Sequence, residues 1–189
     1  MKKTGIKEKI FKLLFLSIGN MLPNKGKPLG KIGNHIRCIL AKGIGVRVGE
    51  GVVINRHAQV QKNVVMADYT GIGDYCLVQE GTVFQGRTLM APYVSIYTEN
   101  HYYDVLKHEF HGFTPIQPVI IGANVWLCRN AVICPGARVG NNSIVAAGAV
   151  VTGEFPDGVV LGGVPAVIQK VLDPELYEKS KLVDVREDK

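Results

Sequence analysis

The chain has 189 residues, of which 22 are glycine and 9 are proline; aromatic residues make up 7% and hydrophobic residues 47%. This hydrophobic content excludes a disordered chain, and the lack of a long uncharged apolar run excludes a transmembrane helix. Glycine does not recur at every third position, which excludes collagen. A glycine-rich but hydrophobic chain of this length predicts one domain with many tight turns between short buried strands.

The formal net charge is +6, and the basic residues crowd the first 47 positions. Such a balance fits an anionic ligand, a phosphorylated cofactor or a membrane surface, and equally fits ordinary surface lysines. No basic patch is interleaved with aromatic residues, so we expect no nucleic-acid partner. The four cysteines contain no C-x-x-C pair. They predict free thiols in a reducing cytoplasm and no metal site.

Residues 1–36 are expected to form an amphipathic helix and a linker. Apolar residues fall at helical spacing at Ile6, Ile10, Leu13 and Leu14, and the helix should end before Pro23. Packing of this apolar stripe against the domain is the simplest interpretation. Contact with a membrane surface is the second, because lysines lie on the other face. A secretion signal is the third.

A six-residue repeat dominates the chain from position 48. With one exception, proline, the first position of each six is aliphatic or phenylalanine, and the fifth is mostly small or β-branched. The first positions are Val48, Ile54, Val60, Met66, Ile72, Val78, Phe84, Met90, Ile96, Pro115, Ile121, Leu127, Ile133, Val139, Val145 and Val151. First and fifth positions lie on one side of a strand, whereas successive repeats on an α-helix would share no face. The repeat is therefore β.

The fourth position of each six marks a corner. Half of its occupants are glycine or asparagine, which adopt left-handed backbone angles at little cost. These are Gly51, Asn63, Gly81, Asn124, Asn130, Gly136, Asn142 and Gly148. Equal strands joined by equal corners predict an all-β solenoid, in which neighbouring coils share parallel ladders.

The repeat lapses once, over residues 102–114, which predicts a protruding loop of functional importance. It resumes at Pro115 and fades after Phe155. Residues 172–189 are expected to form a short C-terminal helix and tail. This helix should begin near Asp173, with Pro174 in its first turn, and include Leu176, Tyr177 and Leu182.

The pattern (Leu/Ile/Val)-Gly-x-x-small-x over residues 37–171 resembles the hexapeptide-repeat acyltransferases. It is closest to sugar and capsular-polysaccharide O-acetyltransferases of the galactoside and maltose type. The most specific segments are Tyr97-Thr98-Glu99-Asn100-His101, Asn124-Val125-Trp126, residues 146–152 (Ala-Ala-Gly-Ala-Val-Val-Thr) and residues 162–166 (Gly-Gly-Val-Pro-Ala). The resemblance implies a left-handed parallel β-helix of about five coils, with three sixes per coil, assembled as a homotrimer with active sites at the subunit interfaces.

The resemblance also implies site residues for acetyl transfer, which needs a base, an oxyanion donor and a cofactor site. His101 matches the family's catalytic histidine, with Asn100 beside it, and Asp104 or the backbone could orient it. Trp126 should point outward and lie near the acyl group, beside the histidine of the neighbouring subunit. The oxyanion donor would be a backbone amide near Arg129.

The cofactor implied is acetyl-CoA, held by the backbone at Ala147 and Gly148 and by the turn at Thr152. The family usually carries a basic residue directly after Gly-x-Pro-Ala and another three positions on; here only the second, Lys170, is basic. Arg129 or Arg138 could compensate, and ordinary surface charge is the alternative for each.

For the acceptor, Asp68 stands where the family places an acceptor-binding asparagine, and a local hydrogen bond at a corner is the alternative. The resemblance therefore implies a cytoplasmic acetyl-CoA-dependent O-acetyltransferase that acts on a sugar hydroxyl in surface-polysaccharide assembly, with His101 as general base. Cys128 and Cys134 leave a covalent route open. The alternatives are a xenobiotic or amino-sugar N-acetyltransferase on the same scaffold, and a non-catalytic β-solenoid binding module.

Overall fold

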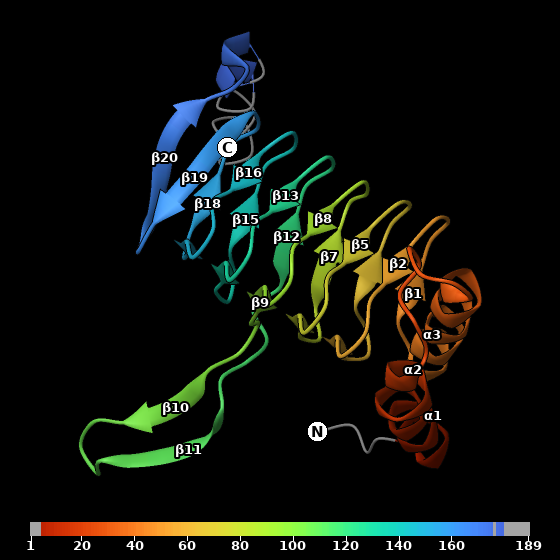
Figure 1. Ribbon diagram of the computed structural model, residues 1–189. Helices are drawn as coiled ribbons and strands as arrows, with labels where there is room; N and C mark the ends of the chain where they lie inside the picture. Colours follow the sequence, from red (N-terminus) through yellow and green to blue (C-terminus); the bar gives the residue numbers. More distant parts are fainter. Residues whose placement is uncertain (1–4, 176, 180–189) are drawn as a thin grey trace.

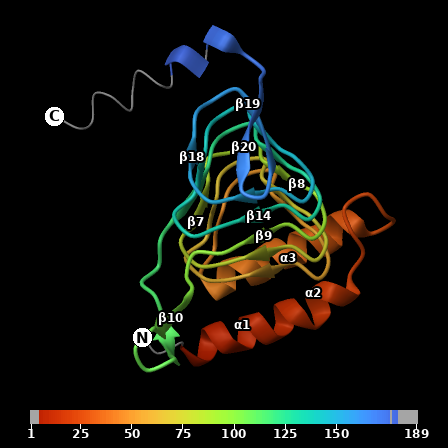
Figure 2. The ribbon, with the colours of Figure 1, turned by 90° about the vertical axis from the view of Figure 1, so that its left-hand side faces the viewer.

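The protein is a triangular coil of short strands with helices at one end and a hairpin protruding from its middle (Figure 1). The structure is a computed structural model and describes residues 5–175 and 177–179. Three helices come first: α1 (Ile6–Leu16), α2 (Ile18–Met21) and α3 (Gly30–Ile44). A view along the coil shows the nested triangular turns, with α3 lying across their base (Figure 2).

The strands form three faces. The first face holds β1 (Arg47–Val48), β4 (Val65–Met66), β7 (Thr82–Phe84), β12 (Val119–Ile121), β15 (Arg138–Val139) and β18 (Glu154–Phe155). The second holds β2 (Val53–Ile54), β5 (Gly71–Ile72), β8 (Leu89–Met90), β13 (Trp126–Leu127), β16 (Ile144–Val145), β19 (Val159–Gly163) and the antiparallel β20 (Ala166–Val171). The third holds β3 (Gln59–Val60), β6 (Leu77–Val78), β9 (Ser95–Ile96), β14 (Val132–Ile133) and β17 (Val150–Val151).

The predicted parallel β-solenoid is confirmed, but it has about six coils instead of five. Phe155 pairs with Val139, and Leu161 pairs with Val145, so the coil continues beyond the point where the six-residue repeat fades. These partners are 16 residues apart, whereas those of the earlier coils are 18 apart. The corner between β17 and β18 is two residues shorter than the others. Counting in sixes therefore no longer gives the buried positions after Val151.

The insertion in the coil is longer than the predicted loop. Phe84 pairs with Ile121, 37 residues further on, so the six that begins at Pro115 forms no strand of the coil. Residues 115–118 are exposed and contain two prolines, which cannot donate to a ladder. The insertion forms a hairpin of β10 (His101–Asp104) and β11 (Glu109–Phe113), which extends away from the prism (Figure 1).

The interior and the corners follow the repeat. First-position side chains such as Ile54, Phe84 and Leu127 are fully buried, each contributing roughly 1.5–3 kcal/mol of transfer free energy. All eight glycine and asparagine corners predicted to be left-handed have positive φ, from 54° at Asn142 to 87° at Gly81.

Helix α1 packs against the body, but with a different face from the predicted one. Phe15 is buried, and the ring of Phe11 lies against Gly43 of α3, where a Cβ atom would collide with it. Ile6, Ile10 and Leu13 point outward instead, with exposed fractions of 79%, 52% and 68%. Of the predicted stripe, Leu14 does pack against the core, as Phe11 does.

Helix α3 was not expected, and it extends across the predicted boundary between residues 36 and 37. The sequence did not predict it because its glycines disfavour a helix. They are needed for close packing: a Cβ on Gly33 would lie 2.6 Å from the carbonyl oxygen of Pro23. The β-helix itself starts at Arg47.

The buried cation of Arg37 helps to join the helices to the coil. Arg37 of α3 is fully buried and donates through Nε to the carbonyl of Ile54 at 2.6 Å. Its terminal nitrogens donate to the carbonyls of Gly19, Leu22 and Pro23 at 2.9–3.0 Å. Burial lowers the pKa of Arg37, and the four carbonyl dipoles offset the cost of removing its charge from water.

At the other end, the predicted C-terminal helix begins where expected. Pro174, Glu175 and residues 177–179 are helical. The Asp173 side chain accepts from the backbone N–H of Glu175 at 3.1 Å, as a cap does. Leu176 and Leu182 lie outside the described residues.

Arg37→Ala should lower the free energy of unfolding by about 3 kcal/mol, because four carbonyl oxygens lose their donors beside a cavity. Chemical denaturation followed by circular dichroism measures this loss. Arg138→Ala is the control, since Arg138 is exposed and its partner Glu154 is exposed too; its effect should stay within about 0.5 kcal/mol. Equal losses of unfolding free energy for the two substitutions would show that Arg37 does not hold the helices to the coil.

Candidate functional site

His101 is the first residue of the protruding hairpin and is exposed. Its ring lies 4.4 Å, centroid to centroid, from the ring of Phe113 and 6.4 Å from that of Phe110. Its Nδ1 atom lies 3.1 Å from the carbonyl oxygen of Gly112. Two aromatic neighbours and one backbone acceptor on β11 thus hold the imidazole.

The contact with Gly112 fixes which nitrogen of His101 carries the proton. A carbonyl oxygen can only accept, so Nδ1 must be the donor in this hydrogen bond. The lone pair of Nε2 is then available, and a neutral imidazole in this tautomer can act as a general base through Nε2.

Asp104 has a different partner from the one considered in the sequence. Its Oδ1 accepts from the backbone N–H groups of Leu106 and Lys107 at 3.0 and 3.1 Å, which closes the hairpin turn. Of the two candidate orienters, the backbone is the one that contacts His101. Asn100 is exposed, and its backbone N–H donates to the side-chain hydroxyl of Thr114 at 2.9 Å, closing the base of the hairpin.

Trp126 points outward, as predicted, and is 46% exposed. It lies in β13 on the second face, between Leu89 and Ile144 of the neighbouring coils. The hairpin that carries His101 leaves from the corner between the third and first faces, which in a triangular prism is opposite the second face. One chain therefore does not bring these two residues together.

The cysteines are all free, as predicted. Burial raises the pKa of Cys128 and of Cys134, and that of the interior Cys76 to about 11. Cys128 and Cys134 are therefore protonated at neutral pH, which disfavours a thiolate nucleophile beside Trp126.

Three of the predicted cofactor residues share the corner between the second and third faces. Ala147 and Gly148 are exposed, and the N–H of Gly148 donates to the carbonyl of Arg129 at 3.0 Å. No heavy atom lies within 4 Å of where a Cβ on Gly148 would stand. This corner is consequently bare backbone, open to a ligand.

Below this opening, the same corner carries a column of stacked rings. His57 stacks on Tyr75 at 4.6 Å, and Tyr75 on Tyr93 at 5.1 Å with the rings 3° from parallel. The guanidinium of Arg129 lies 4.8 Å above the Tyr93 ring. Tyr75 and Tyr93 are 18 residues apart, which is one coil of the six-residue repeat, so their stacking follows from the sequence. The position of the Arg129 guanidinium above them does not, because the insertion separates it from Tyr93.

The other predicted cofactor residues lie elsewhere. Thr152 directly follows β17, at the corner from which the hairpin leaves two coils earlier. Lys170 is exposed on β20, opposite Val160 of β19 at the end of the second face. Arg129, Thr152 and Lys170 thus lie at three different places: two different corners of the prism and the last strand of the second face.

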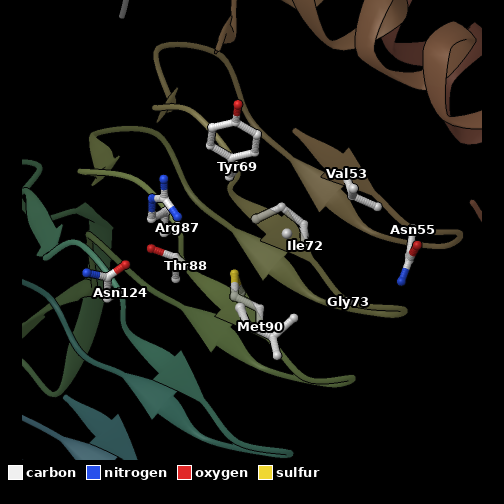
Figure 3. A pocket seen from close by; sticks show the side chains of 11 residues that line it. Val53, Asn55, Tyr69, Ile72, Gly73, Arg87, Thr88, Met90 and Asn124 are labelled. Atoms are coloured by element: carbon white, nitrogen blue, oxygen red, sulfur yellow. The ribbon is translucent and has the colours of Figure 1, made fainter. Parts of the chain in front are cut away.

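Asp68 makes a hydrogen bond between coils, and not the local corner bond considered as the alternative: its Oδ1 accepts from the backbone N–H of Glu50, 18 residues earlier, at 2.8 Å. Next to it, on the second face, lies an open hollow of about 510 Å³. Tyr69, Arg87 and Asn124 line one side of it and Asn55 lies across from them (Figure 3). The Leu89 at its edge pairs with Trp126 in the next coil. Apolar residues, with Tyr69, Arg87, Asn55 and Asn124 at the sides, thus form a hollow near the tryptophan. Of these four, only Asn124 was singled out in the sequence.

The remaining hairpin histidines have partners of their own. His108 Nδ1 lies 3.2 Å from the hydroxyl of Tyr103, and His111 Nε2 lies 3.5 Å from a carboxylate oxygen of Glu109. No cluster of three metal-ligating side chains occurs among residues 5–175 and 177–179. None of the described helices is long and apolar enough to cross a bilayer.

Comparison with known proteins places the chain in a family. Residues 118–153 match the family described as bacterial transferase hexapeptide (six repeats). An Escherichia coli (strain K12) protein named as a lipopolysaccharide biosynthesis O-acetyl transferase, WbbJ, is 33% identical over 153 residues, covering 73% of this chain and 72% of that protein. The chain belongs to the hexapeptide-repeat acyltransferases.

Other relatives match over a smaller share of their length. The galactoside O-acetyltransferase of Lactococcus lactis is 34% identical over 117 residues. The match covers 59% of this chain and 55% of that protein. A solved galactoside acetyltransferase in complex with coenzyme A has a TM-score of 0.67 at 22% identity, covering 90% of this chain and 81% of that one. This likeness confirms the predicted left-handed β-helix.

The hairpin turn generates one prediction that does not depend on any activity. Asp104→Ala should speed amide hydrogen exchange at Leu106 and Lys107 by about tenfold, because both N–H groups lose their acceptor. Exchange measured by mass spectrometry tests this. Asp104→Asn, which keeps an acceptor oxygen, is the matched control and should exchange nearly as the parent does; identical rates in all three proteins would contradict the assignment.

Proposed function

We propose that the protein is an acetyl-CoA-dependent O-acetyltransferase that acetylates a sugar hydroxyl in surface-polysaccharide biosynthesis. The observation that carries the proposal is His101, whose Nδ1–H donates to Gly112 and leaves Nε2 free to accept a proton. The relatives named as O-acetyl transferases and galactoside O-acetyltransferases support both the donor and the acceptor class.

In this mechanism, His101 Nε2 removes the proton from the acceptor hydroxyl as its oxygen attacks the thioester carbon. The negative charge then develops on the thioester oxygen, and the backbone amide near Arg129 is the expected donor to it. The thiolate of coenzyme A leaves and takes up the proton from His101. Raised thiol pKa values favour this direct transfer over an acyl-cysteine intermediate.

Coenzyme A is expected against the bare backbone of Ala147 and Gly148, which leaves room for a pantetheine chain. Arg129 and Lys170 supply positive charge for its phosphates. The hollow beside Trp126 is the expected location of the acceptor, because a tyrosine ring, amides and a guanidinium are groups that bind sugars.

A second subunit completes this site. His101 and Trp126 lie on opposite sides of the prism, so both can act at one substrate only if they come from neighbouring chains. We therefore infer a homotrimer, in which the hairpin of each subunit reaches the second face of the next.

His101→Ala should lower kcat at least about 100-fold through loss of the general base, and leave the affinity for coenzyme A within about twofold. Acetyl-CoA turnover followed by thiol release, and calorimetric titration with coenzyme A, measure the two quantities. His111→Ala is the control on the same hairpin and should keep most activity. A fully active His101→Ala protein would overturn this mechanism.

Mixing His101→Ala with Trp126→Ala subunits, after unfolding and refolding together, should restore activity that neither variant has alone. With random assembly, about a quarter of the sites regain an intact pair when the pair spans two subunits. Thiol release from the mixture is the measurement. No recovery in mixed assemblies, verified by differently tagged subunits, would show that the site lies within one chain.

An N-acetyltransferase, for example of an amino sugar, is the second candidate, and one observation favours transfer to nitrogen. A tetrahydropyridine-dicarboxylate N-acetyltransferase of Staphylococcus aureus is 53% identical over 66 residues, which is 35% of this chain and 28% of that protein. Thiol release with galactosides and maltose, compared with nucleotide-linked amino sugars, distinguishes the two. No detectable binding of coenzyme A would instead support the non-catalytic solenoid.

A further inference from the structure

The two long helices expose apolar residues on the faces turned away from their buried sides. On α1, Ile6, Ile10 and Leu13 follow one another at helical spacing, opposite the buried Phe15, and all are more than half exposed. On α3, Ile32 and Ile39 are 57% and 49% exposed, opposite the buried Arg37. A folded helix needs only one apolar face to pack, so these second stripes are unexplained by the fold.

Charge distinguishes this end of the molecule from the rest. Residues 1–47 hold eleven of the 22 lysines and arginines and only one acidic residue, Glu8. The remaining 142 residues have a net charge of −4, from eleven basic and fifteen acidic residues. Within the described part of the first 47 residues, every lysine is exposed: Lys7, Lys9, Lys12, Lys25, Lys27, Lys31 and Lys42.

The lysines flank the apolar stripes instead of covering them. On α1, Lys9 and Lys12 lie on one side of the stripe and Lys7 on the other, as the helical repeat of 100° per residue requires. Glu8 points inward, with its carboxylate 3.8 Å from Lys62. An apolar stripe with flexible cations on both sides lets the cations reach outward while the stripe is buried.

From these observations we propose that α1 and α3 dock the protein on an anionic lipid bilayer surface. Ile6, Ile10 and Leu13 enter the boundary between headgroups and acyl chains, and the neighbouring lysines meet lipid phosphates. The charge is complementary to acidic lipids. The same positive charge disfavours docking of this surface on a second copy of itself, because two clusters of lysines would meet. The proposal does not depend on acetyl transfer.

Co-sedimentation of the full chain with vesicles tests the proposal. The protein should bind equimolar phosphatidylglycerol–phosphatidylcholine vesicles, bind pure phosphatidylcholine much more weakly, and be released by roughly 0.5 M salt. Ile10→Glu combined with Leu13→Glu should abolish binding, and each of Lys9→Gln and Lys12→Gln should weaken it about fivefold. Leu172→Glu and Lys107→Gln are the matched controls, from an exposed apolar residue and an exposed lysine elsewhere.

The same proteins are examined by analytical ultracentrifugation to separate a membrane from a second copy. An unchanged oligomeric state of the Ile10→Glu, Leu13→Glu variant, together with lost vesicle binding, supports the proposal. Three results overturn it: no binding of the parent to the anionic vesicles, equal loss in the controls, or a changed oligomeric state with vesicle binding intact. Circular dichroism and the activity of the variants in solution confirm that the loss does not come from unfolding.

Discussion

The whole architecture depends on a corner in the left-handed backbone region at the fourth residue of most sixes; Glu99, Pro118 and Glu154 are the exceptions. This corner fixes where each strand stops, so that first-position side chains always return to the interior. Where the corner residue is glycine or asparagine, the conformation costs little. Five corners instead hold bulky side chains with positive φ: His57, Tyr69, Tyr75, Arg87 and Tyr93. At roughly 1–2 kcal/mol each, these are real costs.

The bulky corners offset that strain by contacts with one another along the coil. His57, Tyr75 and Tyr93 form one stack, and Arg87 lies 5.4 Å over the ring of Tyr69 at another corner. Such contacts contribute roughly 0.5–1.5 kcal/mol per pair. In the later coils of the same corner, the guanidinium of Arg129 covers the stack. Gly148 follows one coil further on, and it has no side chain. The column thus supports Arg129 from below and leaves backbone open above it, as a ligand site requires.

Much of this could be predicted from the sequence because the repeat is local and its period is even. The interior positions, the left-handed corners and the tyrosine stack all follow from counting in sixes. Prediction was wrong where the period changes: the two-residue shortening before Phe155 and the six from Pro115. It also missed α3, because its glycines reflect a tertiary demand, the approach of Phe11 to Gly43, which no local propensity contains. The role of Gly112 as partner of His101 likewise depends on strand register within the hairpin.

The position of the hairpin decides what one chain can do alone. An insertion at a corner of a triangular coil extends away from the opposite face, and here that face carries Trp126 and the hollow below it. A hairpin inserted at a corner next to the second face could have closed over Trp126 within one subunit. Placed opposite, it exposes Tyr102, Phe110 and Phe113 to solvent, an apolar surface that a single chain leaves uncovered. In the proposed homotrimer, covering that surface and completing the site are one event, because the neighbouring subunit that would bury the hairpin would also supply the second face.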